Sequence, residues 1–187
     1  MMFNRFALSN LFSETELNKI QKTLRELAYF EIKMNSFGTD CFYLARIEEW
    51  ITDRLTLKGY KSAQCFARLN TEKHDTSFRI HADSCSLDNS GKLFYPEVAC
   101  VFYPFSTPGY GTGLFRHPRW GDRCPINHSF AFTHDDGKWE MYDYCDGIEN
   151  TSFIYLANLY HSRVPNKSFG KSKKDGRIVI VNFMSRQ

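Results

Sequence analysis

The segment SFRIHADS, residues 77–84, places an imidazole and a carboxylate two positions apart, as His81 and Asp83. Its first half alternates apolar and polar residues as a β-strand does, with Phe78 and Ile80 as the apolar members. Side chains two apart on a strand point to the same face, so His81 and Asp83 can approach one metal ion together. The simpler alternative is a His–Asp hydrogen bond near a sheet edge. A metal site requires at least one further ligand from elsewhere in the chain.

His161 is the best placed of the remaining histidines to supply that ligand. It follows the apolar run FIYLANLY at 153–160, which is typical of a buried strand, and it leads into SRVP. The other histidines are His74, His117, His128 and His134. His128 and His134 stand near a predicted turn, where surface or hairpin histidines are common. We therefore take His161 as the candidate third ligand.

An arginine opens the last apolar run of the chain, RIVIVNFM at 177–184. Strand alternation places Arg177 on the same face as two valines and the phenylalanine of this run. A buried guanidinium without an anionic partner is very costly, so a purely apolar core would not contain it. Arg177 therefore needs an anionic partner.

Two amphipathic helices are predicted in the first third of the chain. Residues 13–30 begin with Ser13 and Glu16 at capping-box spacing, and apolar residues then recur at three- and four-residue steps. Residues 42–56 carry a similar apolar stripe. Each helix has a single apolar face, so we expect both to pack on the outside of another layer.

From about residue 62 the sequence changes to short β-rich runs separated by Gly, Pro, Asn and Asp. About eight such runs with little helix between them favour an antiparallel sandwich or barrel over a βαβ fold. DDG at 135–137 predicts a hairpin turn between two of them. The runs are SAQCFARLN, TSFRIHAD, PEVACVFYPF, GTGLFRH, NHSFAFTH, KWEMYDYC, TSFIYLANLYHSRV and RIVIVNFM.

Length and composition predict one globular domain. A chain of 187 residues can bury a substantial core, which we divide into a helical support region at 1–60 and a β-rich core at 61–187. A net charge of +3 is too small to indicate nucleic-acid binding by itself. Neither a signal peptide nor a membrane span is recognisable, so we expect a cytoplasmic protein without a membrane partner. The six cysteines lack zinc-ribbon spacing and are expected to be reduced thiols.

Four landmarks in this order resemble the Fe(II)- and 2-oxoglutarate-dependent dioxygenases, and among them the prolyl-4-hydroxylase-like branch. The resemblance spans roughly residues 62–184. The landmarks are HAD at 81–83, EVACVFYPF at 97–105 with GYGTGLF at 109–115, YHSRVPN at 160–166 and GRIVIVNF at 176–183. A lone His-x-Asp is weak evidence, whereas four landmarks in the correct order and at plausible separations are much stronger.

The resemblance implies a mainly β fold with N-terminal helices, in which about two helices flank a double-stranded β-helix of the jelly-roll, cupin-like type. It implies that His81, Asp83 and His161 bind Fe(II), which leaves coordination positions for the keto acid and O2. It also implies that Arg177 and Tyr103 hold the distal carboxylate of 2-oxoglutarate, since a guanidinium fork suits a planar anion. The implied activity is hydroxylation, which couples decarboxylation of 2-oxoglutarate to succinate with oxidation of a C–H bond.

The chain also departs from the family pattern. The interval from His161 to Arg177 is longer than the family usually shows, because a lysine-rich loop at 165–176 is inserted. Lys171 or Lys174 could therefore compete for the carboxylate, although a loop lysine is the weaker choice. Whether this loop contacts the substrate is not predicted.

Other positions bear on the substrate. Asn70 falls near the place of a family tyrosine that helps bind the keto acid, and we assign it no role. His117 is either a substrate contact at the pocket mouth, with Arg116 and Trp120, or an ordinary loop residue. The substrate itself, whether a protein residue, an amino acid or another small molecule, depends on variable loops without a readable signature. Those loops are 31–41, 84–96 and 116–127.

Two other classes of function stay open. A nucleic-acid alkyl-repair demethylase of the same superfamily carries another arginine six residues after the first, where this chain has Phe183. A non-catalytic cupin-like module shares the fold and binds a metal or small anion without turnover. The carboxylate of Asp83 argues against the related halogenases, which have a small residue at this position.

Overall fold

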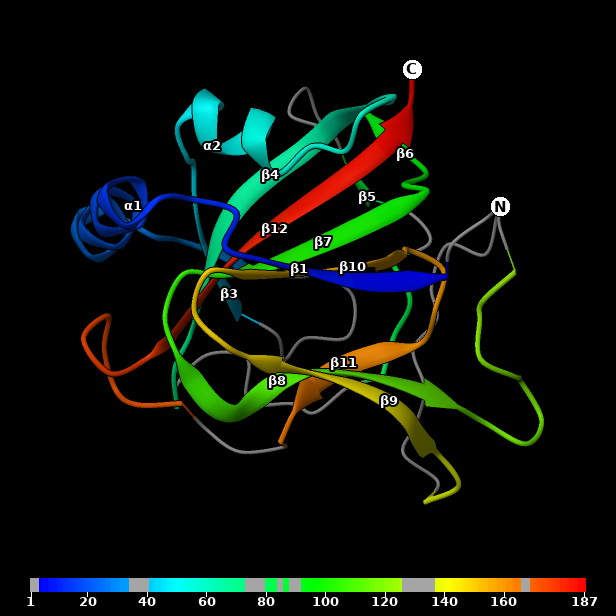
Figure 1. Cartoon of the computed structure of the whole chain (residues 1–187). Helices are drawn as coiled ribbons and strands as arrows, with labels where there is room; N and C mark the ends of the chain where they lie inside the picture. Colours follow the sequence, from blue (N-terminus) through cyan, green and yellow to red (C-terminus); the bar gives the residue numbers. More distant parts are fainter. Residues whose placement is uncertain are drawn as a thin grey trace.

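A computed structural model describes residues 4–33, 41–72, 80–83, 86–87, 92–125, 137–165 and 169–187. Its strands form a seven-stranded antiparallel sheet, the major sheet, and a three-stranded antiparallel sheet, the minor sheet (Figure 1). The major sheet runs in the order β1 (Arg5–Ser9), β10 (Thr151–Leu156), β7 (Val98–Tyr103), β12 (Arg177–Arg186), β4 (Tyr60–Asn70), β3 (Cys41–Ala45) and β2 (Phe30–Lys33). The minor sheet runs β11 (His161–Val164), β8 (Thr107–Arg116) and β9 (Glu140–Gly147), and β5 (Ser86–Leu87) pairs with β6 (Leu93–Phe94). The mainly β prediction is confirmed.

The first predicted helix is present as α1 (Glu14–Glu26), and the predicted capping box forms. The backbone amide of Glu16 donates to Oγ of Ser13, while a carboxylate oxygen of Glu16 accepts from the Ser13 amide at 2.8 Å. These two bonds satisfy amides that an uncapped helix leaves open. The helix ends before residue 30, because the chain there enters strand β2.

The second predicted helix, at 42–56, is wrong over its first part. Residues 41–45 form β3, which pairs with β2 on one side and β4 on the other, and only Glu49–Arg54 form a helix, α2. The apolar spacing of this segment fits a helix locally, but pairing at the edge of the major sheet satisfies its backbone instead. The described part of residues 1–59 therefore contributes β1, β2 and β3 as well as the two helices.

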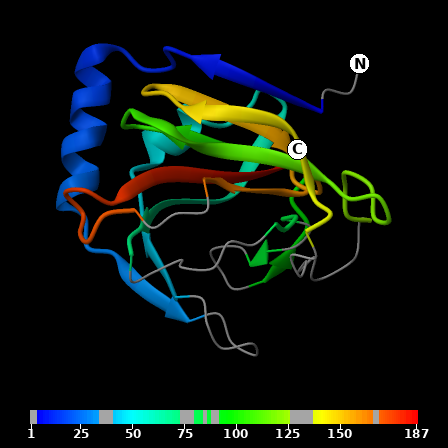
Figure 2. The same ribbon diagram turned by 90° about the horizontal axis from the view of Figure 1, so that it is seen from below.

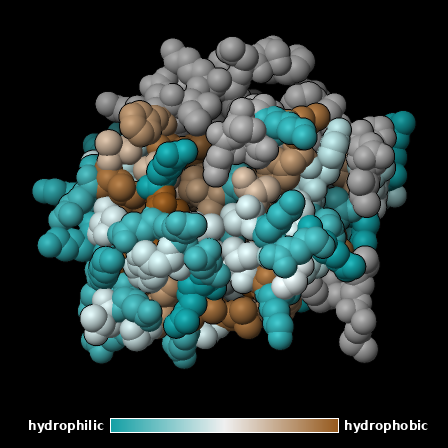
Figure 3. All heavy atoms as spheres, turned by 90° about the horizontal axis from the view of Figure 1, so that it is seen from above, coloured by the Kyte–Doolittle hydropathy of each residue, from teal (hydrophilic) through white to brown (hydrophobic). Residues whose placement is uncertain are grey.

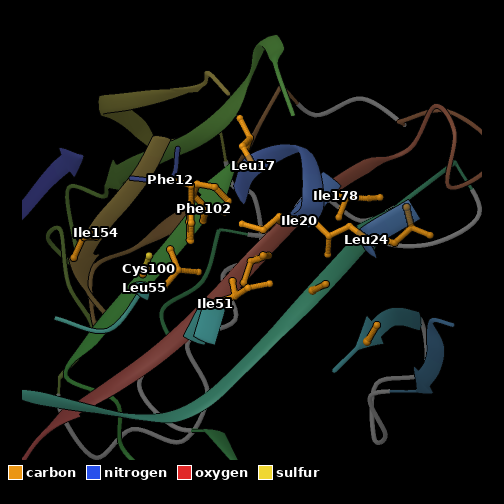
Figure 4. Close-up of a cluster of buried hydrophobic side chains, with 14 of the residues drawn as sticks. Phe12, Leu17, Ile20, Leu24, Ile51, Leu55, Cys100, Phe102, Ile154 and Ile178 are labelled. Atoms are coloured by element: carbon orange, nitrogen blue, oxygen red, sulfur yellow. The ribbon is translucent and has the colours of Figure 1, made fainter. Parts of the chain in front are cut away.

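An outer core fills the space between the helices and one face of the major sheet. Leu17, Ile20 and Leu24 of α1 and Ile51 of α2 pack with sheet residues such as Ile178 (Figure 4). Ile20 and Leu24 are almost completely buried, as expected for the single apolar stripe of an amphipathic helix. On the face seen from above, the coloured side chains are mostly hydrophilic, with brown patches between teal ones (Figure 3). The packing of α1 and α2 residues against sheet residues shows that the helices cover the outer face of the major sheet.

An inner core fills the space between the two sheets. Val101, Phe153, Val179 and Val181 of the major sheet share it with Leu114 of the minor sheet. Neighbouring positions such as Ile178 and Ile180 belong to the outer core, so successive residues of one strand face opposite layers. Figure 2 shows the strands layered one above another, with α1 along one side.

The run at 151–164, predicted as one strand, is two strands in different sheets. β10 lies in the major sheet and β11 in the minor sheet, and a turn at 157–160 joins them. The predicted strand at 127–134 and the first half, 76–79, of the one at 76–83 lie outside the described residues. The passage of the chain from β10 in the major sheet to β11 in the minor sheet matters, because the turn and β11 carry residues of the candidate site.

The described cysteines agree with the expectation of reduced thiols. Cys65, Cys100, Cys124 and Cys145 are free. Burial raises the pKa of both Cys65 and Cys100 to about 12, so both thiols stay protonated near neutral pH. Among the described helices, none has the length and apolar character needed to cross a membrane.

Candidate metal centre

His81 and His161 lie side by side because their backbones pair as an isolated β-bridge. The amide of His81 donates to the carbonyl oxygen of His161 at 2.9 Å, and the amide of His161 donates to that of His81 at 2.8 Å. Two residues further on, the amide of Asp83 donates to the carbonyl oxygen of Ala157 at 2.8 Å. The segment HAD is therefore attached to the turn between β10 and β11.

The side chains of His81, Asp83 and His161 converge. One ligand atom from each lies within 4.8 Å of the others. Nε2 of His161 is 3.1 Å from one carboxylate oxygen of Asp83, and Nε2 of His81 is 3.8 Å from the other. Two imidazoles and one carboxylate are the donor set of a facial non-haem iron site. The structure thus brings together the three residues that the sequence singled out.

His161 is held in the tautomer that a metal ligand requires. Its Nδ1 lies 2.9 Å from the carbonyl oxygen of Leu159. A carbonyl oxygen can only accept, so Nδ1 carries a proton, and Nε2, which faces Asp83, is the nitrogen available to bind a metal. The side chain is only 7% exposed, and its ring packs against Tyr155 with centroids 4.8 Å apart. This arrangement matches the outer contacts that orient metal-bound histidines.

The carboxylate of Asp83 is favoured in its charged form. Burial alone raises its pKa, but the nearby His161, His81 and Arg68 together outweigh this, and the net pKa lies below its usual range. An ionised carboxylate is the form that binds a metal. The three residues therefore fit a divalent cation in charge as well as in position.

Arg177 is the first residue of β12, faces the space between the sheets and is only 5% exposed. Its Nη1 donates to Oδ1 of Asn70 at 3.1 Å, and its Nη2 donates to the carbonyl oxygen of Gly111 at 3.4 Å. The guanidinium carbon lies 5.7 Å from the ring centre of Tyr103 and 5.5 Å from that of Phe169. These contacts hold and orient the guanidinium.

Two buried hydroxyl groups lie next to this arginine. Tyr103 is 1% exposed, and its hydroxyl donates to Oγ1 of Thr112 at 2.7 Å. Burial raises the pKa of Tyr103 despite the opposing effect of Arg177, so the phenol stays protonated. Thr112 accepts from Tyr103 and keeps its own proton to donate. Together with Arg177, the two hydroxyls can bind one carboxylate.

The loop lysines do not occupy this position. Lys171 and Lys174 are exposed, and Nζ of Lys173 donates to the carbonyl oxygen of Leu27 just beyond α1 at 2.9 Å. The backbone amide of Lys171 donates to the carboxylate of Asp175, and such bonds lower the pKa of Asp175 to about 2. The described part of the loop is thus bonded to itself and to the end of α1, while the buried cation is Arg177.

His117 lies outside the three-residue group. It is 5% exposed, its ring stacks on Trp120 with centroids 4.1 Å apart, and its Nδ1 accepts from the Arg119 amide at 3.1 Å. His117 and Arg116 line a cavity of about 510 Å³. The other lining residues are Pro118, Gly121, Asp122, Lys138, Glu140 and Tyr142. The described lining includes none of the three convergent residues, so this cavity is separate from the candidate metal centre.

Three residues of the site were not expected from the sequence. Asn70, which received no role, is 1% exposed and contacts Arg177, and Thr112 is 4% exposed and contacts Tyr103. Arg68 shares the inward face of β4 with Asn70, and its charge lowers the pKa of Asp83. Strand alternation could have identified Arg68 and Asn70 from the sequence. Residues 66, 68 and 70 share one face of β4, while Ala67 and Leu69 lie on the other.

The fold is shared with several solved structures. The epimerase SnoN in complex with Fe3+, alpha ketoglutarate and nogalamycin RO superposes with a TM-score of 0.61 at 10% identity, covering 98% of this chain and 79% of that one. HygX from Streptomyces hygroscopicus with nickel, 2-oxoglutarate and hygromycin B gives 0.54 at 9%, covering 98% and 83%. HygX with iron bound gives 0.54 at 10%, again covering 98% and 83%. No protein-family model and no curated protein sequence matches the chain. The predicted jelly-roll fold is confirmed.

Proposed function

We propose that this chain is a non-haem Fe(II)- and 2-oxoglutarate-dependent oxygenase, and specifically a hydroxylase of the prolyl-4-hydroxylase-like branch. The observation that carries the proposal is the convergence of His81, Asp83 and His161, together with the buried Arg177. Tyr155 packs against His161 and Tyr103 lies beside Arg177, and both tyrosines belong to the inner core. The convergent residues suit a ferrous ion, and Arg177 suits the distal carboxylate of a keto acid. The fold shared with SnoN and HygX, whose structures contain a metal and the keto acid, supports this pairing.

Each residue has a defined task in this proposal. His81 and His161 bind through Nε2, and the Leu159 carbonyl keeps His161 in the required tautomer. Asp83 completes the set and brings one negative charge. When bound, Fe(II) with the keto acid supplies the chemistry that activates O2 and oxidises a C–H bond.

The second half of the site binds and orients the co-substrate. Arg177 pairs with the distal carboxylate of 2-oxoglutarate, and Tyr103 and Thr112 offer hydroxyl groups to it. Apolar residues such as Val179 and Phe153 line the interior and exclude water. The overall reaction is balanced as 2-oxoglutarate plus O2 plus R–H giving succinate plus CO2 plus R–OH.

A small molecule is the favoured substrate. The SnoN and HygX complexes contain nogalamycin RO and hygromycin B, both small organic molecules, on the same fold. SnoN is an epimerase, so product analysis has to separate hydroxylation from epimerisation. Phe183, where alkyl-repair demethylases carry a second arginine, is buried in the inner core, which argues against a nucleic-acid substrate.

The test is an anaerobic titration with Fe(II) and 2-oxoglutarate, followed by admission of O2. We expect a visible metal-to-ligand charge-transfer band before O2 and succinate after it. Absence of both the band and succinate would remove the proposal. The band without any succinate, under conditions that turn over a known oxygenase, would indicate a non-catalytic binding module.

Comparing the variant D83N with the matched control D53N tests whether the charge-transfer band comes from the proposed metal centre. Asp53 is an exposed carboxylate on α2, remote from the proposed ligands. We expect D83N to lose the band and D53N to keep it. Turnover that persists in H81A would show that the ligand assignment is wrong.

A further inference from the structure

The cavity of about 510 Å³ lies at one end of the minor sheet. Arg116 at the end of β8 and Glu140 at the start of β9 form part of its lining. The turn after β8, which His117 and Gly121 close through two backbone hydrogen bonds of 2.9 Å, forms another part. Tyr142, which packs against the inner core, lines the cavity as well. Its size is that of a site for a small organic ligand.

The register of β8 places this cavity beyond a proposed metal ligand, on the side away from Arg177. The carbonyl oxygen of Gly111 accepts from Arg177. Further along the strand, Leu114 pairs with His161. Strand alternation puts Arg116 on the same face as Leu114, about 7 Å further on. The cavity and Arg177 thus lie on opposite sides of His161 along β8, as the substrate and co-substrate sites of one oxygenase need to.

Backbone hydrogen bonds join the cavity lining to the residue before His161. The amide of Tyr160 donates to the carbonyl oxygen of Asp122, a lining residue, at 3.0 Å. The carbonyl oxygen of Tyr160 accepts from the amide of Phe115, which precedes Arg116, at 2.8 Å. These bonds hold the cavity close to the proposed metal ligand.

The polar part of the lining consists of paired charges. Nε and Nη2 of Arg116 donate to the two carboxylate oxygens of Glu140, at 3.0 and 2.8 Å, and both side chains are more than half exposed. A guanidinium has five N–H groups and a carboxylate about four acceptor sites, so a doubly bonded pair keeps donors and acceptors for a further molecule. Asp122 is paired in the same way, with Nε of Arg123 at 3.3 Å. Groups of this kind suit hydroxyls, which both donate and accept, better than they suit an ion.

The apolar part of this region consists of aromatic rings. The ring of His117 stacks on Trp120, which is 42% exposed, with centroids 4.1 Å apart. Trp139 lies on the other side of the group, 4.9 Å from His117. Burial raises the pKa of Tyr142, so its hydroxyl stays protonated and can donate. Aromatic faces carry partial negative charge and attract C–H groups, while the paired charges bind hydroxyls. The combination suits a molecule with an apolar face and a hydroxyl-rich rim.

We infer that this cavity binds a neutral polyhydroxylated ring, a sugar or a cyclitol, and that the substrate carries such a ring. The inference rests on the proposed function, because the cavity is a substrate site only if the metal centre is catalytic. Arg116 and Glu140 bind the hydroxyls, and the rings of Tyr142 and His117 contact the C–H face. A ring held here directs the adjoining part of the substrate toward His161, where a C–H bond can be oxidised.

The experiment uses protein loaded with 2-oxoglutarate and either Mn(II) or Zn(II), in which no turnover occurs. Calorimetry first measures the affinity for 2-oxoglutarate. Saturation-transfer NMR then measures binding of methyl glucoside, methyl galactoside and myo-inositol, beside the charged analogues glucosamine and glucuronate and the unsubstituted ring tetrahydropyran. Mn(II) is paramagnetic and broadens the signals of ligand protons near it, so comparison with Zn(II) shows which probes bind close to the metal.

The variants are R116M, R116K and W120A, and the control is R54M. Arg54 is an exposed arginine on α2 that pairs with Glu16, so it matches Arg116 in exposure and in having a glutamate partner. R116K keeps the charge and serves if R116M does not fold. We expect every variant to bind 2-oxoglutarate within about threefold of wild type, because none of these residues contacts Arg177 or the proposed metal ligands in the described structure.

At least one neutral polyol should bind wild type, with signals that Mn(II) broadens and Zn(II) does not. R116M and W120A should each weaken that polyol about tenfold, with R116K intermediate and R54M unchanged. The inference is overturned if no neutral polyol binds, if a charged analogue or tetrahydropyran binds as well, if Mn(II) has no effect, or if R116M and W120A behave like R54M. Failure of wild type to bind 2-oxoglutarate would instead remove the proposed function, even if a polyol still bound in the cavity.

Discussion

The two faces of β4 and β12 have opposite characters. The outer face, which the helices cover, carries Ala67, Leu69 and Ile180, all buried and apolar. The inner face begins with apolar pairs and ends with charged and polar side chains, of which Arg177 and Asn70 are in contact. The same two strands thus have one face that is apolar throughout and one face that changes from apolar to polar along its length.

The difference separates stability from function. Apolar packing is non-directional, so the outer face needs only side chains of suitable size. The polar end of the inner face needs partners with defined geometry, because a buried charge or hydroxyl is costly without them. Substitutions on the two faces should therefore change different measurements.

The largest effect is expected for a proposed metal ligand on the inner side. H161A removes one of three ligands, and we expect Fe(II) affinity to fall by more than the roughly 10–100-fold typical of changes to outer contacts of a metal site. A chelator competition assay measures this affinity. If H161A bound Fe(II) as tightly as wild type, His161 would not be a metal ligand. D53N, on the outer helix α2, is the control that keeps full affinity.

The next effect is expected at Arg177. R177M leaves a bound carboxylate without its partner, which costs about 2–5 kcal/mol, or roughly 30-fold or more in affinity. Calorimetry of the Mn(II)-loaded protein should show this loss for 2-oxoglutarate, with Mn(II) affinity unchanged and R177K intermediate because lysine lacks the planar fork. If R177M bound 2-oxoglutarate with unchanged affinity, another cation would have to bind its distal carboxylate. The loop lysines would then be the next candidates.

Thr112 should show a smaller effect of the same kind. T112V removes the hydroxyl that, in the proposed site, accepts from Tyr103 and donates to the carboxylate of 2-oxoglutarate. The lost bond to the carboxylate is worth about 1–1.5 kcal/mol, so affinity for 2-oxoglutarate should fall about tenfold. T112S keeps the hydroxyl and should restore most of the affinity. Loss of affinity in T112S as well would point to packing at this position instead of hydrogen bonding.

The sequence predicted one face of this comparison better than the other. The apolar stripe of α1 and the strands β7 and β12 follow from spacing, because many residues repeat the same signal. The segment at 42–45 was assigned to a helix, since its stripe was locally helical and only pairing with β2 and β4 makes it a strand. Local patterns thus identified the elements, and sheet pairing changed one of them.

The site divides in the same way. His81, Asp83 and Arg177 were identified because a charged or ligating residue in a strand pattern is conspicuous. Arg68 and Asn70 were not, because a polar residue alternating with Ala67 and Leu69 is also what a half-exposed strand shows. Only the second sheet, which covers the inward face, makes these positions interior. That information is long-range, since the covering strands come later in the chain.

The smallest effect is expected on the outer face, where I180V removes one methyl group from a fully buried position. The free energy of unfolding should fall by about 1 kcal/mol, which corresponds to a melting temperature about 2–4 °C lower. Urea denaturation measures the change, and V179A, on the inner face one residue away, is the matched comparison. Because Ile180 packs in the outer core, affinity for 2-oxoglutarate should be unchanged in I180V at a temperature where the protein stays folded. If I180V bound 2-oxoglutarate as weakly as V179A does, the two faces of the sheet would be coupled. Packing under the helices would then help to position Arg177.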